Sequence, residues 1–402
     1  MTNKTKKNND NIFNLVIDPL ADSIKILFKE AKKALGFNIV DFDKLFKELG
    51  ICNKSNEYPK LENVYEEDYF KRYSFKIPIG ICVEDFKRHK EAIYHFLEVD
   101  NANIERNKSN IDIKVLTRVP KANYDIHEYK RKDFKIPLGY DLNNNKLILW
   151  DITSNNNCHC YIAGSNGGGK SVTLRLILCH LVNCKSKYDI EFSIINTKRV
   201  DLKDFEYCKH TKKYMCGTEG VEEFLEDELE EMERRYILLE RADCDDLKEY
   251  RSKGNKIPYR LIVIEEISSY KGNKEYQRAI ELLASQGRGA GIILLMVTQL
   301  PSAEIMPNTV KCNINTTIGL KTKDEIRSDI IAPDGELHKL KGNGHSKLFD
   351  GENDGVEYQG LYIDKETMKD IIYKNKRAIE AGTSITPGDN KNLAQNLLSP
   401  KL

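Results

Sequence analysis

Eight consecutive residues of the chain match the phosphate-binding loop pattern G-x-x-x-x-G-K-S/T. An apolar run at 161–163 precedes them and a helical pattern over 171–181 follows, which is the setting that such a loop requires. Glycines let the backbone curl, so that successive N–H groups and the helix N-terminus point at phosphate oxygens. We expect Lys170 to reach the terminal phosphates of ATP and Ser171 to bind Mg²⁺; the alternative is a glycine-rich turn without a ligand. The residues predicted to bind the nucleotide are Gly164, Ser165, Asn166, Gly167, Gly168, Gly169, Lys170, Ser171 and Val172.

Two carboxylates, Glu265 and Glu266, directly follow a second apolar run at 261–264. In a parallel sheet, such a strand carries its last residues to the carboxyl edge, where ligands of open α/β folds bind. We expect Glu265 to support the hydrated Mg²⁺ ion, and Glu266 to orient and deprotonate the attacking water as the catalytic base. The alternative is an acidic strand end that faces solvent.

Gln299 follows a third apolar run, at 292–297. A polar amide at the carboxyl end of a neighbouring strand is placed to sense the terminal phosphate, and we include it among the catalytic candidates. The alternative is a turn residue that caps a helix.

Composition restricts the function less than these motifs do. The 63 Lys and Arg residues against 62 Asp and Glu residues give a formal charge of +1, so any contact with nucleic acid must come from a local patch.

Cys158 and Cys160 flank His159, but their spacing is tighter than that of the usual zinc ligand pairs and no second pair follows. Reduced thiols of a cytoplasmic protein are the expectation, with zinc as the alternative. Apolar runs such as 292–297 are far shorter than the ~20 residues of a membrane-spanning helix, so no transmembrane segment is predicted.

The order of the elements predicts an α/β core. Apolar β-type runs at 161–163, 192–195, 261–264, 292–297 and 316–320 alternate with helical patterns, which is typical of a mainly parallel sheet covered by helices. Between residues 74 and 150, β-type runs at 75–81, 111–116, 134–138 and 146–150 surround a helix-like stretch at 84–97, which indicates a small α+β domain. Amphipathic helices are predicted at 24–35 and 41–49. The predicted divisions are a disordered tail (1–10), a helical segment (11–73), the small α+β domain (74–133), the motor domain (134–386) and a flexible tail (387–402).

Further motifs fall in the order seen in FtsK/SpoIIIE motors, and over residues 134–372 the chain resembles that family. They are His159, the stretch 196–202 (NTKRVDL), 231–236 (EMERRY), 257–259 (IPY), 287–292 (GRGAGI), 298–301 (TQLP), 310–313 (VKCN), 324–327 (DEIR) and 360–364 (GLYID). The resemblance implies a RecA-like P-loop NTPase core, preceded by a smaller domain. Asn196 and Thr197 stand where the family usually has Asp-Pro.

The resemblance also implies a function: an ATP-dependent translocase of double-stranded DNA, working as a homohexameric ring with ATP bound between subunits. An arginine from the neighbouring subunit can complete such a site. Arg288 and Arg327 are the candidates, and the family pattern favours Arg288. The short form is similar to the coupling ATPases of plasmid and mobile-element transfer. This resemblance implies a cytoplasmic protein. It also implies a further class of partner, membrane-anchored transfer or division proteins, which would recruit the protein to a membrane. The alternatives are a protein-secretion ATPase of the same superfamily and a regulatory NTPase that moves nothing.

Overall fold

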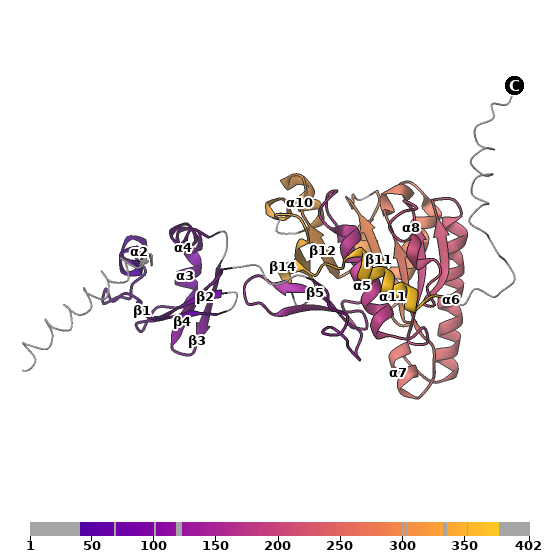
Figure 1. The fold of residues 1–402 in the computed structure, drawn as a ribbon, viewed down its shortest axis with the longest axis horizontal. Helices are drawn as coiled ribbons and strands as arrows, with labels where there is room; N and C mark the ends of the chain where they lie inside the picture. Colours follow the sequence, from indigo (N-terminus) through magenta and orange to yellow (C-terminus); the bar gives the residue numbers. More distant parts are fainter. Residues whose placement is uncertain are drawn as a thin grey trace, which may run out of the picture. The chain divides into compact units, whose positions relative to one another are not determined.

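The computed structural model describes residues 41–377, apart from 68–69, 100–101, 118–122, 300, 303, 333–335 and 352. Two compact units make up the chain, Met1–Arg118 and Val119–Leu402 (Figure 1). The helix predicted at 24–35 and the tails predicted at 1–10 and 387–402 lie outside the described residues.

The first unit is built on a four-stranded antiparallel sheet in the order β1-β2-β4-β3. Its strands are β1 (Lys60–Glu66), β2 (Phe70–Lys76), β3 (Ala102–Asn107) and β4 (Asn110–Leu116), and its helices are α2 (Phe42–Leu49), α3 (Val83–Arg88) and α4 (Lys90–Leu97). Helix α2 confirms the helix predicted at 41–49: the Asp41 carboxylate accepts the N–H of Lys44, and Gly50 ends the helix at φ 65°.

Two expectations from the sequence, a domain boundary and a helix, differ from the structure in this unit. The boundary expected after residue 73 falls inside β2, because the segment expected to be helical contains β1 and most of β2. Every residue of β1 is exposed, so the alternation that signals a half-buried strand is missing. The single helix expected at 84–97 is two helices, since His89 leaves the helical region at φ −108° and ψ 19°.

The second unit holds a ten-stranded sheet in the order β6-β5-β14-β13-β12-β7-β11-β10-β8-β9. The six strands from β12 to β9 are parallel, which confirms the predicted sheet, and four antiparallel strands extend it. The parallel strands are β7 (Cys160–Ala163), β8 (Ile190–Asn196), β9 (Thr211–Cys216), β10 (Tyr259–Ile264), β11 (Ile292–Thr298) and β12 (Thr316–Leu320). The antiparallel strands are β5 (Lys135–Asp141), β6 (Leu147–Asp151), β13 (His345–Phe349) and β14 (Asp354–Gly360).

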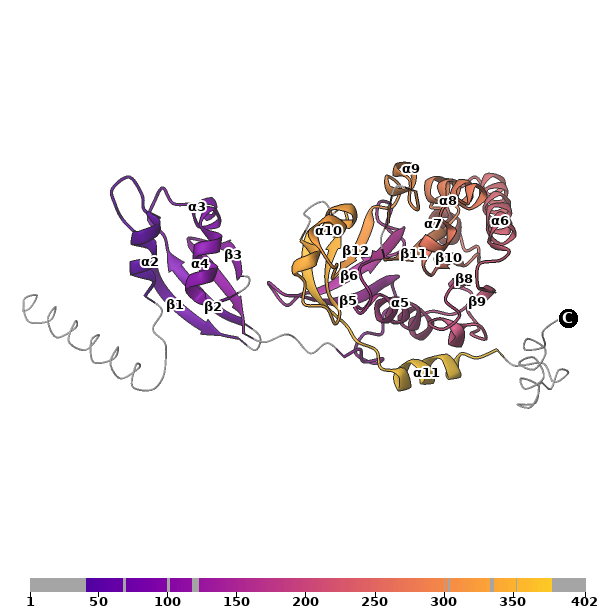
Figure 2. The same cartoon turned by 90° about the horizontal axis from the view of Figure 1, so that it is seen from above.

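Helices cover both faces of this sheet (Figure 2). Helices α5 (Lys170–Cys184) and α11 (Lys365–Lys374) pack on one face, and α6 (Val221–Arg241) and α8 (Lys274–Gln286) on the other. The apolar side chains of β10 alternate between the two cores, and every residue of the strand is buried, which explains the continuous apolar run at 261–264. The shorter helices are α7 (Leu247–Ser252), α9 (Asn308–Lys311) and α10 (Glu325–Ile331), with 3₁₀ turns η1 (Lys203–Phe205), η2 (Ile267–Tyr270) and η3 (Leu337–Lys339).

The start of this unit is a third difference from the expected divisions. Residues 123–133 were assigned to the small domain, but Tyr124 and Tyr129 are buried in the core beneath α5. The Tyr124 N–H donates to the Tyr362 carbonyl at 2.8 Å, and its hydroxyl lies 2.9 Å from His180 Nδ1.

No helix among the described residues is both long and apolar enough to span a membrane.

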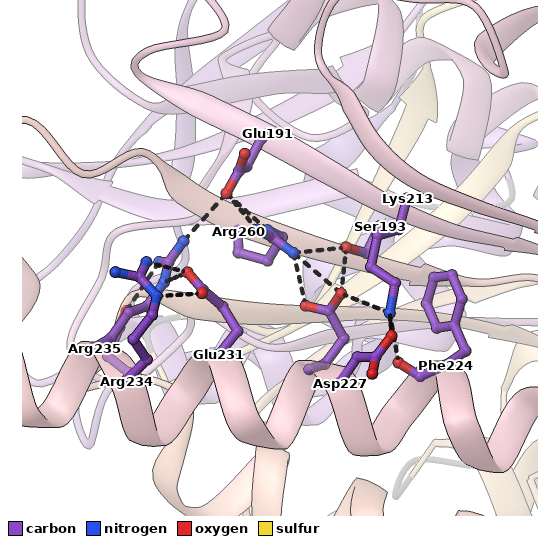
Figure 3. A network of polar contacts seen from close by, with 11 residues as sticks. Glu191, Ser193, Lys213, Phe224, Asp227, Glu231, Arg234, Arg235 and Arg260 are labelled. Atoms are coloured by element: carbon purple, nitrogen blue, oxygen red, sulfur yellow. Dashed lines mark hydrogen bonds and ion pairs between the residues drawn. The ribbon is translucent and has the colours of Figure 1, made fainter.

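A buried network of charges fixes α6 against the sheet (Figure 3). The Arg260 guanidinium on β10 donates to both carboxylate oxygens of Glu228 on α6, at 3.0 and 2.9 Å, and to Glu191 on β8. The Ser193 hydroxyl donates to the same Glu228 carboxylate at 2.7 Å. Glu228 has no exposed surface and Arg260 has 4%, so each charge depends on the other for compensation.

We therefore expect Glu228→Gln to lower the free energy of unfolding by about 3–5 kcal/mol, because it leaves a buried guanidinium short of one carboxylate. Denaturant titration of the full chain measures this loss. Arg234→Gln is the matched control: it removes a guanidinium of the same helix whose side chain is 56% exposed, and should cost less than about 1 kcal/mol. Equal losses from the two variants would contradict the assignment.

Candidate nucleotide site

The register of four parallel strands brings the predicted site residues to one edge of the sheet. Ala163, the last residue of β7, pairs with Thr298, the last residue of β11. Ile264, the last residue of β10, pairs with Met296 on one side and Ile195 on the other. The phosphate-binding loop, Gln299, the two glutamates and the turn after β8 therefore all begin at the carboxyl edge, with β11 between the loop strand and the strand of the glutamates.

The loop follows β7 and leads into α5, as the sequence predicts. A Cβ atom at Gly164 would lie 2.8 Å from the Leu320 Cβ and 2.9 Å from the Leu320 carbonyl oxygen, so only glycine fits there. Gly169, at φ 114°, starts α5 in a conformation that residues with side chains rarely adopt. The loop thus ends at the N-terminus of a fifteen-residue helix, whose dipole favours an anion.

The Lys170 ammonium lies against this loop. Its Nζ donates to the carbonyls of Gly164 at 2.7 Å and Ser165 at 3.1 Å. Burial lowers the pKa of Lys170 to about 8; the nearby Glu266 opposes this shift and the positive charge of Lys198 adds to it. A cation held so close to a second cation is stabilised by a polyanion such as a triphosphate.

A serine and two carboxylates form the position predicted for Mg²⁺. The Ser171 hydroxyl donates to Asp201 Oδ2 at 2.6 Å. Burial raises the pKa of Glu265 to about 7, and the negative charge of Asp201 adds to the shift. Glu265 Oε1 is buried and has no hydrogen-bond partner among the described residues. Oxygen donors, adjacent negative charges and a buried acceptor without a donor fit a hard divalent cation, so these residues suit Mg²⁺.

Glu266 lies beside Gln299. The Gln299 side-chain amide donates to Glu266 Oε2 at 3.2 Å, and the Ser268 hydroxyl donates to Glu266 Oε1 at 2.5 Å. Burial opposes ionisation, but hydrogen bonds from Ser268 and Lys198 lower the pKa of Glu266 below its ordinary value. Its backbone has φ 57°, a strained value for a residue with a side chain, which surrounding contacts must maintain.

Sequence reasoning missed the role of the turn after β8. Lys198 and Asp201 lie in the stretch 196–202, which supported only the family resemblance, yet both contact residues of the site. Lys198 Nζ lies 2.9 Å from Glu266 Oε2, and Asp201 accepts from Ser171. The available signal was a run of polar residues directly after a buried strand, the same signal that identified Glu265 and Glu266.

A pocket of about 700 Å³ is lined by the loop residues 165–168. Gln299 lies in its wall, and the cationic side chains of that wall come from Lys321, Lys323, Arg327 and Lys341. Arg327 pairs with Asp324 at 2.6 Å. The pocket is therefore electrostatically suited to phosphate groups next to the loop.

The two candidate arginines lie in different places. Arg327 faces the pocket beside the loop of its own chain. Arg288 is exposed and precedes β11, whereas Gln299 follows it, so the seven-residue strand, about 23 Å long, separates Arg288 from the carboxyl edge. Its Nη1 donates to the Asn155 carbonyl at 2.6 Å. Arg288 is therefore not part of the site formed by its own chain.

The Cys-His-Cys cluster has a different environment. His159 Nδ1 accepts the backbone N–H of Leu294 at 3.0 Å and so links the residue before β7 to the middle of β11. Burial lowers the pKa of His159 to about 4. The imidazole is thus a neutral hydrogen-bond acceptor inside the sheet.

Comparisons with known proteins agree with this geometry. The model of the FtsK/SpoIIIE family matches residues 125–327. A DNA translocase FtsK of Borreliella burgdorferi is 30% identical over 260 residues, which cover 61% of this chain and 33% of that protein. The DNA translocase FtsK of Clostridium tetani is 26% identical over 377 residues, which cover 89% of this chain and 50% of that protein. This chain therefore spans between a third and a half of the length of these relatives.

Solved structures show the same fold. The pCW3 conjugation coupling protein TcpA, in its monomer form with ATPγS, has a TM-score of 0.58 at 21% identity, over 82% of this chain and 97% of that one. The cytoplasmic domain of the type VII secretion ATPase EccC of Thermomonospora curvata has a TM-score of 0.56 at 20% identity, over 63% of this chain and 32% of that one.

We expect Glu266→Gln to bind ATP but to hydrolyse it about 10²–10⁴-fold more slowly than wild type, because the amide keeps the shape and loses the base. Lys170→Ala should abolish turnover by removing the charge that faces the terminal phosphates. Phosphate release and fluorescent-nucleotide binding measure the two effects separately. If Glu265→Gln were inactive and Glu266→Gln active, the roles of the two glutamates would be reversed.

Proposed function

The chain belongs to the FtsK/SpoIIIE family of P-loop ATPases, and from this premise we propose that it is an ATP-driven translocase of double-stranded DNA. The observation that carries the proposal is the arrangement at the carboxyl edge: the loop of Lys170 and Ser171 follows β7, Glu266 follows β10, and Gln299 follows β11, which lies between those two strands. The relatives described as DNA translocases and the fold shared with a conjugation coupling protein support it. We further propose action in plasmid or mobile-element DNA transfer or segregation.

The residues divide the chemistry among them. The loop N–H groups and the N-terminus of α5 would bind the phosphates, and Lys170 would neutralise the terminal ones. Ser171, Asp201 and Glu265 would hold Mg²⁺, which when bound neutralises charge on the phosphate oxygens. Glu266 would take the proton of the attacking water at its carboxylate, and the Gln299 amide, 3.2 Å from that carboxylate, would orient the same water.

We propose that the working form is a homohexamer in which Arg288 completes the site of a neighbour. Its position at the amino edge of the sheet supports this, because it is too far from its own loop to act there. Helix α6 fixes the loop that carries it: Arg235 donates to the Ala290 carbonyl at 3.1 Å and Tyr236 to the Gln286 carbonyl at 2.5 Å. An arginine between two residues that α6 holds in this way is prepared to enter a second subunit without a large loss of entropy.

DNA would be held through its phosphates, which needs local rather than global positive charge. Lys311 and Lys321 are two candidates for such contacts: Lys321 is exposed, whereas Lys311 is half-buried and its Nζ lies 3.4 Å from the Ile330 carbonyl. Lys321 is therefore the better candidate. The proposal extends to a cytoplasmic location, with membrane-anchored transfer or division proteins as the partners that recruit the motor.

The fold alone also suits other members of the superfamily, since EccC is a secretion ATPase with a similar domain. A protein-secretion ATPase would respond to polypeptide rather than to DNA, and a regulatory NTPase would respond to neither. Turnover with and without duplex DNA therefore separates the translocase from the other two functions, and turnover with polypeptide separates those two from each other.

Long duplex DNA should raise the rate of ATP turnover regardless of its sequence. The logarithm of DNA affinity should fall linearly with the logarithm of salt concentration, by about 0.9 for each phosphate contacted. Steady-state ATPase assays and a salt series of DNA binding measure these effects, with Lys170→Ala as a control that binds DNA without turnover. Unchanged turnover, or preference for one sequence, would contradict a non-specific motor.

Arg288→Ala should leave ATP binding intact and reduce turnover by about 10³-fold or more. Mixing it with Lys170→Ala subunits should restore part of the activity, because some interfaces then pair an intact loop with an intact arginine. Arg327→Ala is the matched control: Arg327 faces the loop of its own chain, so mixing it with Lys170→Ala should restore nothing. Mixed hexamers that form, as shown by mass measurement, yet stay inactive with Arg288→Ala would argue against action between subunits.

A further inference from the structure

One short turn contacts both glutamates and Ser171. It runs from Thr197 to Asp201, directly after β8. The Thr197 hydroxyl donates to the Glu265 carbonyl, and the Lys198 N–H donates to Glu265 Oε2 at 3.2 Å. At its other end, Asp201 accepts from Ser171. Through the Lys198 N–H and the side chains of Thr197 and Asp201, this turn is thus attached to Glu265 and to Ser171.

The side chain of Lys198 occupies the centre of this arrangement. Its Nζ lies 2.9 Å from Glu266 Oε2, the same oxygen that accepts from the Gln299 amide. Glu266 is almost fully buried at 5% exposure, whereas the Lys198 side chain is 40% exposed. The carboxylate is therefore fixed, and the ammonium, on its flexible four-carbon stem, is the member of the pair that is free to move.

This ion pair conflicts with the role of Glu266 as a base. A carboxylate that already accepts from an ammonium, an amide and the Ser268 hydroxyl has few lone pairs left for the proton of water. Lys198 and Lys170 both lie close enough to Glu266 to interact with its charge. Two ammonium groups thus converge on one carboxylate, and a terminal phosphate entering between them would offer a more highly charged partner.

We propose that Lys198 is a positioning residue that holds Glu266 in the nucleotide-free enzyme and moves to the terminal phosphate when ATP binds. The base is then released only in a site that holds a triphosphate. ADP lacks this phosphate, so the Lys198–Glu266 pair stays closed in the ADP-bound site. The inference rests on the proposed ATPase function of this edge, but not on DNA as the substrate.

Nucleotide affinity measured without DNA tests whether Lys198 leaves Glu266 for the terminal phosphate. Lys198→Ala should weaken binding of the slowly hydrolysed analogue ATPγS by about tenfold to a hundredfold, as expected for the loss of a charge-assisted hydrogen bond, and change ADP affinity by less than about threefold. Lys198→Arg should retain most of the preference for ATPγS over ADP, because it keeps the charge. Lys203→Ala, which removes an exposed lysine five residues further along, should match wild type.

A double-mutant cycle separates the exchange from a general electrostatic effect. Glu266→Gln removes the competing partner of Lys198, so it should tighten ATPγS binding by about tenfold in the protein that has Lys198. In the Lys198→Ala background, the same substitution should tighten binding several-fold less. Equal tightening in both backgrounds would overturn the proposal, and so would equal weakening of ATPγS and ADP by Lys198→Ala.

Failure of the DNA-translocase proposal leaves a different result. A chain whose turnover ignores duplex DNA but whose ATPγS preference depends on Lys198 would keep this inference and lose the DNA substrate. A DNA-stimulated ATPase with no coupling between Lys198 and Glu266 would keep the function and lose the inference.

Discussion

The hydrogen-bond register of the parallel strands is the constraint on which the site depends. Strands β7, β11, β10 and β8 end within two residues of one another in register, so their next residues project from one edge. Helices cover both faces of these strands, and a slip of one residue would exchange the side chains between the two cores. Burial on both faces therefore fixes the register, and the register brings Glu265, Glu266 and Gln299 to the edge from which the loop leads to Lys170.

Charges fix the two ends of the same strands in different ways. At the carboxyl edge, ammonium groups and carboxylates are held in pairs with exposed members, which a phosphate can rearrange. Towards the amino edge, the Arg260–Glu228 pair is buried and surrounded by further hydrogen bonds, so it cannot rearrange without a large cost. The rigid end holds the loop of Arg288 and the adaptable end holds the nucleotide site. In the proposed hexamer, a subunit built in this way would offer a fixed arginine to its neighbour and an adjustable site for its own nucleotide.

Sequence reasoning located the loop and its neighbouring strands because both signals are local: a contiguous motif, and continuous apolar runs in strands buried on both faces. It did not find β1, whose residues are all exposed, or the antiparallel pair β13 and β14, which extends the sheet after the predicted core. The roles of Lys198 and Asp201 were also missed. These roles depend on contact between the turn after β8 and Glu265, which follows that turn by more than sixty residues in the sequence. Only the pairing of β8 with β10 brings the two together. Domain boundaries failed for a related reason, since Tyr124 is buried by residues distant in sequence.

Displacement of a triplex-forming strand from linear duplex DNA tests the central claim, that hydrolysis at this edge moves the protein along DNA. Purified full-length protein and ATP should displace the third strand, with a delay that grows in proportion to the length of duplex between the free end and the triplex. Glu266→Gln protein should bind the same DNA without displacing the strand, since binding needs only phosphate contacts and movement needs turnover. Rapid DNA-stimulated hydrolysis without displacement, or displacement that does not depend on distance, would contradict the account.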